Sequence, residues 1–268
     1  MISPLASIHP TAQLGTNVTV DAFAVISENV TVGDDSHVMS HAVLMPFTMI
    51  GKGCTLFPGC VIGSVPQDLK FIGEETTAEI GDGTTIREYV TVNRGTKDKW
   101  KTVVGRHCLL MAYAHVAHDC TVGNNVILAN GVQLAGHVEI GDYAIIGGLA
   151  GAHQFTRIGA HTYIAGHTVI RKDVPPYVKA AREPMSYMGL NIVGLQRRGF
   201  PQEGIDIISR IYHLLFVGNH STTTAIGMIN EKVPDGPLKA EILGFVTSSK
   251  TGIIKRYSKT GSDDDQTF

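Results

Sequence analysis

An aliphatic residue recurs at every sixth position over most of this 268-residue chain, and this spacing constrains the fold more than any other feature. The first run covers 8–62 without a failure, and the same phase returns over 80–92 and 104–170. A period of six fits neither an α-helix, with 3.6 residues per turn, nor an array of hairpins. It is typical of short strands that tight corners join into a coil with three sides.

The residue two positions before each aliphatic one is usually small or β-branched, so both should point into the coil. Every cysteine occupies this small inward position, and we interpret the four as core residues rather than as disulfides or metal ligands. They are Cys54, Cys60, Cys108 and Cys120. A glycine often follows the aliphatic residue, as at Gly15, Gly33 and Gly51, where we expect a corner with an unusual φ.

Three hexads should make one turn, and parallel strands stack about 4.8 Å apart, so some eight turns predict a prism on the order of 40 Å long. Composition agrees with a narrow interior, because the chain has 30 glycines but only one tryptophan. The predicted fold is mainly β, a parallel β-helix of hexapeptide repeats over 1–174.

Two stretches break the repeat and should leave the prism as loops. The first covers about 64–79, where Asp68 and Glu74 stand at positions that would face the core. The second covers 94–102, a polar and basic stretch with Asp98 at the in-phase position.

The repeat stops after Asp173, at a Val-Pro-Pro sequence that cannot continue strand pairing. We expect a linker over 175–200 and a small α-helical cap over 201–268 that covers the open end of the coil. Helical spacing of apolar residues predicts helices that begin at about Pro201 and span Thr222–Lys232 and Pro237–Ser249.

The net charge of −2 argues against a general attraction to nucleic acid or to an acidic membrane. No apolar stretch is long enough to span a bilayer, and the first ten residues do not resemble a secretory leader. We therefore expect a cytoplasmic protein without a nucleic-acid partner and without stable membrane insertion.

A narrow prism has no deep pocket, so a site should form between neighbouring prisms, which predicts a closed ring of three copies. Half of the twelve histidines gather in the later repeats: His115, His118, His137, His153, His161 and His167. They could simply decorate the outside of strands, they could bind zinc as in γ-class carbonic anhydrases, or one could act as a general base. His118, which Asp119 follows, is the best candidate for a base, and we expect no metal.

Several motifs are more specific than the hexad itself. They are IGSVPQDLKFIGEE (62–75), IREYVTVNRGT (86–96), HVAHDCTVGN (115–124), LAGHVEIGDYAIIGG (134–148), HQF (153–155), DVPPY (173–177) and GLQRRGF (194–200). With these motifs the chain resembles the UDP-N-acetylglucosamine 3-O-acyltransferases that begin lipid A biosynthesis, a family of hexapeptide-repeat transferases. The resemblance implies a left-handed coil, a homotrimer and no cofactor.

The resemblance also implies roles for individual residues. His118 would deprotonate the sugar 3-hydroxyl, and the amide of Gly136 would stabilise the oxyanion. The sugar and diphosphate would be held by Asp68, Lys70, His115, His137 and Gln154. The nucleotide and phosphates would contact Asn191, Arg197 and Arg198.

The acyl donor implied by the resemblance is a (3R)-3-hydroxyacyl chain on acyl carrier protein, which is strongly acidic. A basic surface could receive it, although scattered lysines explain the same residues equally well. These residues are Lys97, Lys99, Lys101, Arg106, Arg157, Arg171, Lys172, Lys179 and Arg182. Gly166 stands where some relatives close the acyl groove with a larger side chain, which predicts a long acyl chain.

Some alternatives stay open at this point. Val193 replaces a glutamate that some relatives carry near the ribose, and no residue excludes an acceptor with an amine in place of the 3-hydroxyl. The chain could also be an acetyltransferase that uses acetyl-CoA, a carbonic-anhydrase-like enzyme or a scaffolding coil.

Overall fold

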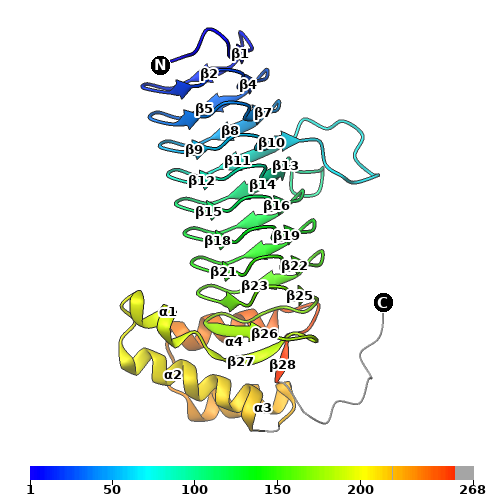
Figure 1. Cartoon of the computed structure of the whole chain (residues 1–268). Helices are drawn as coiled ribbons and strands as arrows, with labels where there is room; N and C mark the ends of the chain where they lie inside the picture. The colour runs from blue at the N-terminus through cyan, green and yellow to red at the C-terminus, as the bar shows by residue number, and fades with distance from the viewer. Residues whose placement is uncertain (219, 257–268) are drawn as a thin grey trace.

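The computed structural model describes residues 1–218 and 220–256, so the last part of the expected cap, 257–268, lies outside the described residues. A three-sided prism of stacked strands carries a helical domain at one end (Figure 1). The fold is a left-handed parallel β-helix, as expected. No helix in the described ranges has the length and apolar character needed to cross a membrane.

Each side of the prism is one sheet. The first sheet contains β1 (Ser7–Ile8), β4 (Val25–Ile26), β7 (Val43–Leu44), β10 (Val61–Ser64), β13 (Thr91–Asn93), β16 (His115–Val116), β19 (Gln133–Leu134), β22 (Gly151–Ala152) and β25 (Val169–Ile170). The second contains β2 (Gln13–Leu14), β5 (Thr31–Val32), β8 (Thr48–Ile50), β11 (Thr77–Ile80), β14 (Lys101–Val104), β17 (Thr121–Val122), β20 (Glu139–Ile140) and β23 (Arg157–Ile158).

The third sheet contains β3 (Thr19–Val20), β6 (His37–Val38), β9 (Thr55–Leu56), β12 (Thr85–Ile86), β15 (Leu109–Leu110), β18 (Ile127–Leu128), β21 (Ile145–Ile146), β24 (Tyr163–Ile164), β26 (Val178–Ala181), β27 (Ser186–Leu190) and β28 (Lys255–Arg256). We call the edge from the first to the second sheet corner 1, the edge from the second to the third corner 2, and the edge from the third to the first corner 3.

Strands of successive turns pair in parallel, and the register reveals the two insertions. Ser7 pairs with Val25, one turn of 18 residues later, whereas Met49 pairs with Glu79 and Thr91 with His115. Residues 65–76 therefore leave the prism as a long loop after β10, and a shorter loop, residues 94–100, connects β13 to β14 (Figure 1).

The interior is filled by the two inward positions of each hexad, as expected. Ile26 and Leu44 exemplify the aliphatic position, and Ala24 and Ala42 exemplify the small one; all are buried. The four cysteines are also buried and unpaired, which confirms their assignment to the core. Burial raises the pKa of the Cys60 and Cys120 thiols to about 12, so these groups stay protonated.

The expectation of an unusual φ at the glycines after the aliphatic residues is confirmed at Gly63, where φ is +83°, and is wrong at the other glycines of this set. Gly15 and Gly33 have ordinary φ, and the left-handed residues come two positions later, as at Asn17 and Asp35. Glycine is needed here because successive turns almost touch at this point. A Cβ on Gly15 would lie 2.7 Å from the backbone nitrogen of Asp34 on the next turn.

The described residues that follow the coil form a helical domain that packs against its last turns. Its helices are α1 (Ile192–Arg197), α2 (Gln202–Tyr212), a π-helix (His213–Val217), α3 (Thr222–Lys232) and α4 (Pro237–Thr247), which confirms the three expected helices. Within 175–200, where the sequence suggested a linker, β26 pairs in parallel with β24, and β27 and α1 follow. Buried Tyr212 donates its hydroxyl hydrogen to the carbonyl of Pro176 and ties α2 to the coil.

Asp173 joins the last turn of the coil to the segment after α4. Its buried carboxylate accepts hydrogen bonds from the Arg157 amide and from the hydroxyls of Ser249 and Thr251. The Tyr177 hydroxyl donates to Glu241 of α4. These polar contacts fix the position of the helical domain on the prism.

Candidate active site

A buried histidine–aspartate pair lies at corner 1, between β16 and β17. Nδ1 of His118 lies 2.8 Å from Oδ2 of Asp119, and the side chains are 6% and 0% exposed. Since a carboxylate only accepts, Nδ1 must donate, and Nε2 is left with its lone pair. Nε2 has no hydrogen-bond partner in the part of the chain that the structure describes. The pair is therefore arranged to take a proton at Nε2.

Four donors surround the Asp119 carboxylate. Oδ1 accepts from the backbone amides of Thr96 at 2.9 Å and Lys99 at 3.2 Å. Oδ2 accepts from the Thr96 hydroxyl at 2.7 Å and from His118. Burial alone would raise the pKa of Asp119, but these hydrogen bonds outweigh it and hold the pKa below its ordinary value. Asp119 is thus a fixed negative charge beneath the imidazole.

Gly136 lies one turn further along the coil and faces the His118 ring. A Cβ on Gly136 would lie 2.5 Å from Cε1 and 2.7 Å from Nε2 of His118, so only glycine fits at this position. The Gly136 N–H finds no acceptor among residues 1–218 and 220–256. A free backbone donor therefore lies beside the free imidazole nitrogen, as oxyanion stabilisation requires.

His137 forms the second wall of the site. Its ring meets that of His118 edge-on, with centroids 5.1 Å apart, and stacks on Phe155 at 4.5 Å. Nδ1 of His137 lies 3.2 Å from Oδ2 of Asp98 in the 94–100 loop. Burial lowers the pKa of His137, although the charges of Asp119 and Asp98 oppose this shift. The ring is therefore mostly neutral near pH 7.

A shallow groove runs from the site along the first sheet. Its volume is about 360 Å³, and it is lined by His115, Ala117, Gln133, Leu134, Ala135, Gly151, Ala152, His153 and Val169. Nδ1 of His115 lies 2.7 Å from the Thr91 hydroxyl, and burial, followed by the charge of His118, lowers the pKa of His115. This groove was not predicted from the sequence, although the small residues Ala135 and Gly151 at outward positions were a visible signal.

The structure brings together only part of the residues that the resemblance suggested. His118, Gly136 and Gln154 occupy the same place on three successive turns at corner 1, where Gln154 is exposed. His115 and His137 lie beside them. The contact of Thr96 with Asp119 was not predicted, because a polar loop gives no sequence signal for what its side chains contact.

The other suggested residues lie elsewhere on the chain. Asp68 and Lys70 belong to the 65–76 loop, where the Lys70 amide donates to Oδ1 of Asp68 at 2.9 Å. Gly166 is exposed at corner 3, where a Cβ would lie 2.9 Å from the Gly148 carbonyl oxygen. No hydrogen bond or ion pair joins either group to His118 within the described ranges of one chain.

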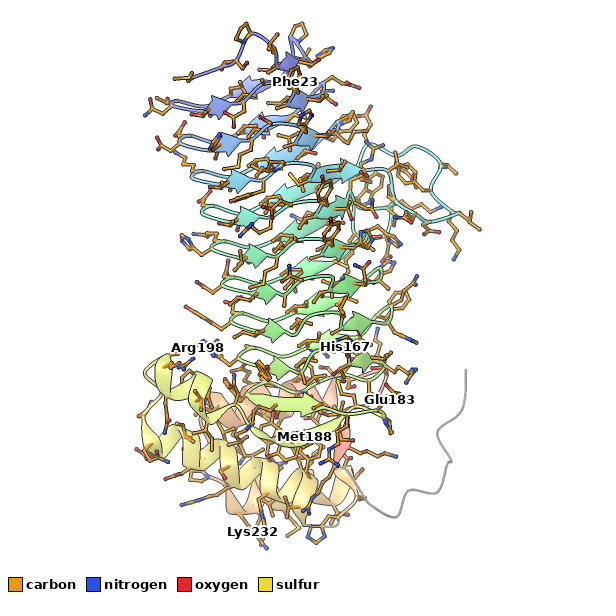
Figure 2. All side chains as sticks on the ribbon, in the orientation of Figure 1. Phe23, His167, Glu183, Met188, Arg198 and Lys232 are labelled. Carbon is orange, nitrogen blue, oxygen red and sulfur yellow. The ribbon has the colours of Figure 1, made fainter. Side chains whose placement is uncertain are left out.

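The remaining three suggested residues lie in α1 or at its ends, next to corner 2. Asn191 is buried, donates to the His161 carbonyl at 2.9 Å and caps α1 through the Gly194 amide. Arg198 donates to the Tyr143 carbonyl at 3.1 Å, and its Nη1 is buried without a hydrogen-bond partner among the described residues. Arg197 is exposed beside it. Figure 2 shows Arg198 and the corner 3 residue His167 on opposite sides of the prism.

The suggested basic surface is partly neutralised. Several of its residues form ion pairs with acidic neighbours: Lys99 and Arg157 with Glu139, Lys101 with Glu79, and Arg171 with Glu183. Exposed pairs of this kind contribute little stability, but they reduce the positive field that a partner would meet.

His118, Asp119 and His137 also offer three ligand atoms within 4.8 Å of one another, a spacing that could hold a metal ion. The hydrogen bonds argue for the histidine–aspartate pair instead. The Asp119 carboxylate already accepts four donors, which is about the number of lone pairs it has.

Comparisons with known proteins agree with this architecture. Residues 101–136 match the family model "Bacterial transferase hexapeptide (six repeats)", and residues 173–254 match "Udp N-acetylglucosamine O-acyltransferase; Domain 2". A Thermodesulfovibrio yellowstonii protein named acyl-(acyl-carrier-protein)–UDP-N-acetylglucosamine O-acyltransferase is 42% identical over 256 residues, which cover 95% of this chain and 99% of that protein.

Solved structures give the same result. LpxA of Bacteroides fragilis, described as a UDP-N-acetylglucosamine acyltransferase, is 47% identical with a TM-score of 0.93, and the match covers 95% of this chain and 100% of that one. LpxA of Acinetobacter baumannii is 39% identical with a TM-score of 0.91 over 94% of this chain and 99% of that one.

The coil and the histidine–aspartate pair at its corner define a hexapeptide-repeat transferase. The relatives match it over nearly their whole length, including the helical domain. The chain belongs to the UDP-N-acetylglucosamine O-acyltransferase family, and it is an acyltransferase.

Proposed function

We propose that this enzyme transfers a long-chain (3R)-3-hydroxyacyl group from acyl carrier protein to the 3-hydroxyl of UDP-N-acetylglucosamine, the first step of lipid A biosynthesis. The observation that carries the proposal is the free Nε2 of His118, held by Asp119 and placed against the Gly136 backbone. The family membership supplies the substrate class.

His118 would act as the general base. Nε2 takes the proton of the sugar 3-hydroxyl while the hydroxyl oxygen attacks the thioester carbonyl. Asp119 stabilises the imidazolium that forms. The Gly136 amide donates to the oxyanion. When the tetrahedral intermediate collapses, the C–S bond breaks and the imidazolium returns its proton to the departing thiolate. The ester and the free thiol are the products.

The remaining candidate residues support an assembly of three copies. They lie at corner 1, at corner 2, at corner 3 and on the 65–76 loop of one prism. They can surround one substrate only if neighbouring prisms meet, and a ring of three repeats that contact three times. Loop residues Leu69 and Ile72 are 105% and 84% exposed, which suits a segment that reaches a second copy.

The nucleotide and phosphates would bind near α1. The buried Nη1 of Arg198 has no hydrogen-bond partner in the described ranges, and Arg197 is exposed next to it, so both can meet an oxyanion. Asn191 would fix the position of α1 by capping it. Asp68, Lys70, His115, His137 and Gln154 would hold the sugar and diphosphate.

The acyl chain would run along a surface that Gly166 and its neighbour Gly148 leave without side chains. A long acyl chain is therefore preferred, since each buried methylene contributes about 0.8 kcal/mol. Competition between donors of different length tests this, and a preference for a donor of about ten carbons would contradict it.

The test of the reaction is transfer of a long 3-hydroxyacyl group from acyl carrier protein to UDP-N-acetylglucosamine. Wild type, His118→Ala and a control, His9→Ala at the far end of the coil, are compared. We expect full activity in the control and a loss of about a hundredfold or more in His118→Ala. An active His118→Ala enzyme would exclude this base. If wild type is inactive with this substrate pair but active with a CoA thioester or with the 3-amino sugar, the proposed donor or acceptor is wrong.

A further inference from the structure

The 94–100 loop interrupts the repeat at the turn next to the His118 site. Three of the four hydrogen bonds to the Asp119 carboxylate come from this loop, two from Thr96 and one from Lys99. Thr96 is 7% exposed even though its neighbours in the loop are polar and basic. The loop therefore folds back onto the catalytic corner instead of extending into solvent.

The loop also contacts the next turn of the coil. Asp98 lies 3.2 Å from His137, and Lys99 forms an ion pair with Glu139 at 2.9 Å. The Trp100 amide donates to the Thr96 carbonyl at 2.7 Å, which closes the loop on itself. These contacts fix the loop on both sides of Thr96. The Thr96 amide and hydroxyl are therefore kept directed at the Asp119 carboxylate.

The Thr96 hydroxyl has a particular place among these donors. It shares Oδ2 of Asp119 with Nδ1 of His118, whereas both backbone amides bind Oδ1. A third group competes for Oδ2, because Nε2 of His137 lies 3.8 Å from it. Without the hydroxyl, the carboxylate could turn toward His137 and loosen its hold on His118.

We propose that Thr96 is a positioning residue for acyl transfer. Its hydroxyl and amide hold the Asp119 carboxylate in the one orientation that directs Oδ2 at Nδ1 of His118, so that the ring keeps its proton on Nδ1 and presents Nε2 to the substrate. Thr96 touches no reacting atom and acts through Asp119. The inference rests on the proposed function, because it requires His118 to be the base.

Thr96→Val is the decisive variant, because valine keeps the shape and the backbone amide and removes only the hydroxyl. We expect kcat to fall about tenfold, roughly the effect of one charge-assisted hydrogen bond, while KM for the sugar nucleotide changes less than about twofold. The acid limb of the kcat profile should move to lower pH, because a carboxylate that turns toward His137 stabilises the imidazolium of His118 less.

Two further variants separate positioning from folding. Thr96→Ser restores a hydroxyl and should recover most of the wild-type kcat and its pH profile. Thr84→Val removes another buried threonine hydroxyl, which donates to the Gly105 carbonyl at 2.8 Å far from the site. It should lower the melting temperature as much as Thr96→Val does and leave kcat unchanged.

Measuring His118→Ala in the same series distinguishes failure of the Thr96 inference from failure of the proposed base. If His118→Ala is inactive and Thr96→Val matches wild type in kcat and pH profile, the role of Thr96 is refuted and the base stands. If Thr96→Ser is as impaired as Thr96→Val, a hydroxyl is not what matters, and the inference is also refuted. If His118→Ala keeps full activity, the base and the inference fail together.

Discussion

Gly136 lies directly against the imidazole of His118, so that a Cβ at this position would lie 2.5 Å from the ring carbon Cε1. His118 cannot retreat, because Nδ1 is held by buried Asp119. One glycine therefore leaves room for the candidate base, and its amide is the donor that the proposed function assigns to the oxyanion.

Gly136→Ala should abolish most of the activity while the fold persists. The added methyl must displace the His118 ring, and we expect kcat/KM to fall about a hundredfold or more, a typical effect of disturbing an oxyanion donor. Gly244→Ala in α4 is the matched control, because a Cβ there meets no atom of residues 1–218 and 220–256 within 4 Å. Steady-state transfer assays and circular dichroism check both variants, and near-normal turnover by Gly136→Ala would contradict the proposed geometry.

Asp119→Asn should retain the substrates but lose turnover. An asparagine oxygen can still accept from the loop, but its NH₂ group cannot accept from Nδ1 of His118, so the ring is driven toward the wrong tautomer. We expect kcat to fall by about 10²–10⁴ with a small change in KM. Single-turnover measurements test this, and an unchanged chemical step would show that the carboxylate does not orient the base.

Stability should decrease as pH falls from about 6.5 to about 4, partly because of His161. Burial, followed by the charge of Arg198, lowers the pKa of His161 from 6.5 to about 4. In this pH window His161 binds a proton in the unfolded chain but not in the folded chain, so acid favours unfolding. His161→Phe keeps the stacking on Tyr143 and Tyr177 and removes the titration.

Urea unfolding at pH 7.5 and pH 5 measures this difference. The stability of His161→Phe should fall less between the two pH values than that of wild type. His167→Gln, at an exposed histidine, should follow wild type. Parallel pH dependence in wild type and His161→Phe would count against the assignment.

Asp173→Ala should loosen the helical domain from the coil. The change leaves the Arg157 amide and the hydroxyls of Ser249 and Thr251 without their buried acceptor, and we expect a loss of about 2–4 kcal/mol in the free energy of unfolding. Asp206→Ala, on an exposed part of α2, is the control and should change stability by less than about 0.5 kcal/mol. Equal effects of the two variants on stability would refute the proposed role of Asp173 in joining the helical domain to the coil.

Much of the fold could be read from the sequence because the repeat is a local property. Each hexad specifies its own strand and corner, and successive turns contact only their neighbours, so the prism, its core cysteines and the three helices followed from spacing alone. Asp119 is the next residue after His118 in the sequence, and His137 follows His118 by one turn of 18 residues plus one, which is why the two histidines lie on neighbouring turns.

Other features depended on contacts that no spacing encodes. The packing of adjacent turns, rather than an unusual φ, explains Gly15 and Gly33. β26 and β27 extend the third sheet beyond the prolines. The sequence by itself determined the coil and the place of the candidate base on it. Only the tertiary structure decided that Thr96 holds Asp119, because a loop outside the repeat takes its conformation from the surface on which it packs.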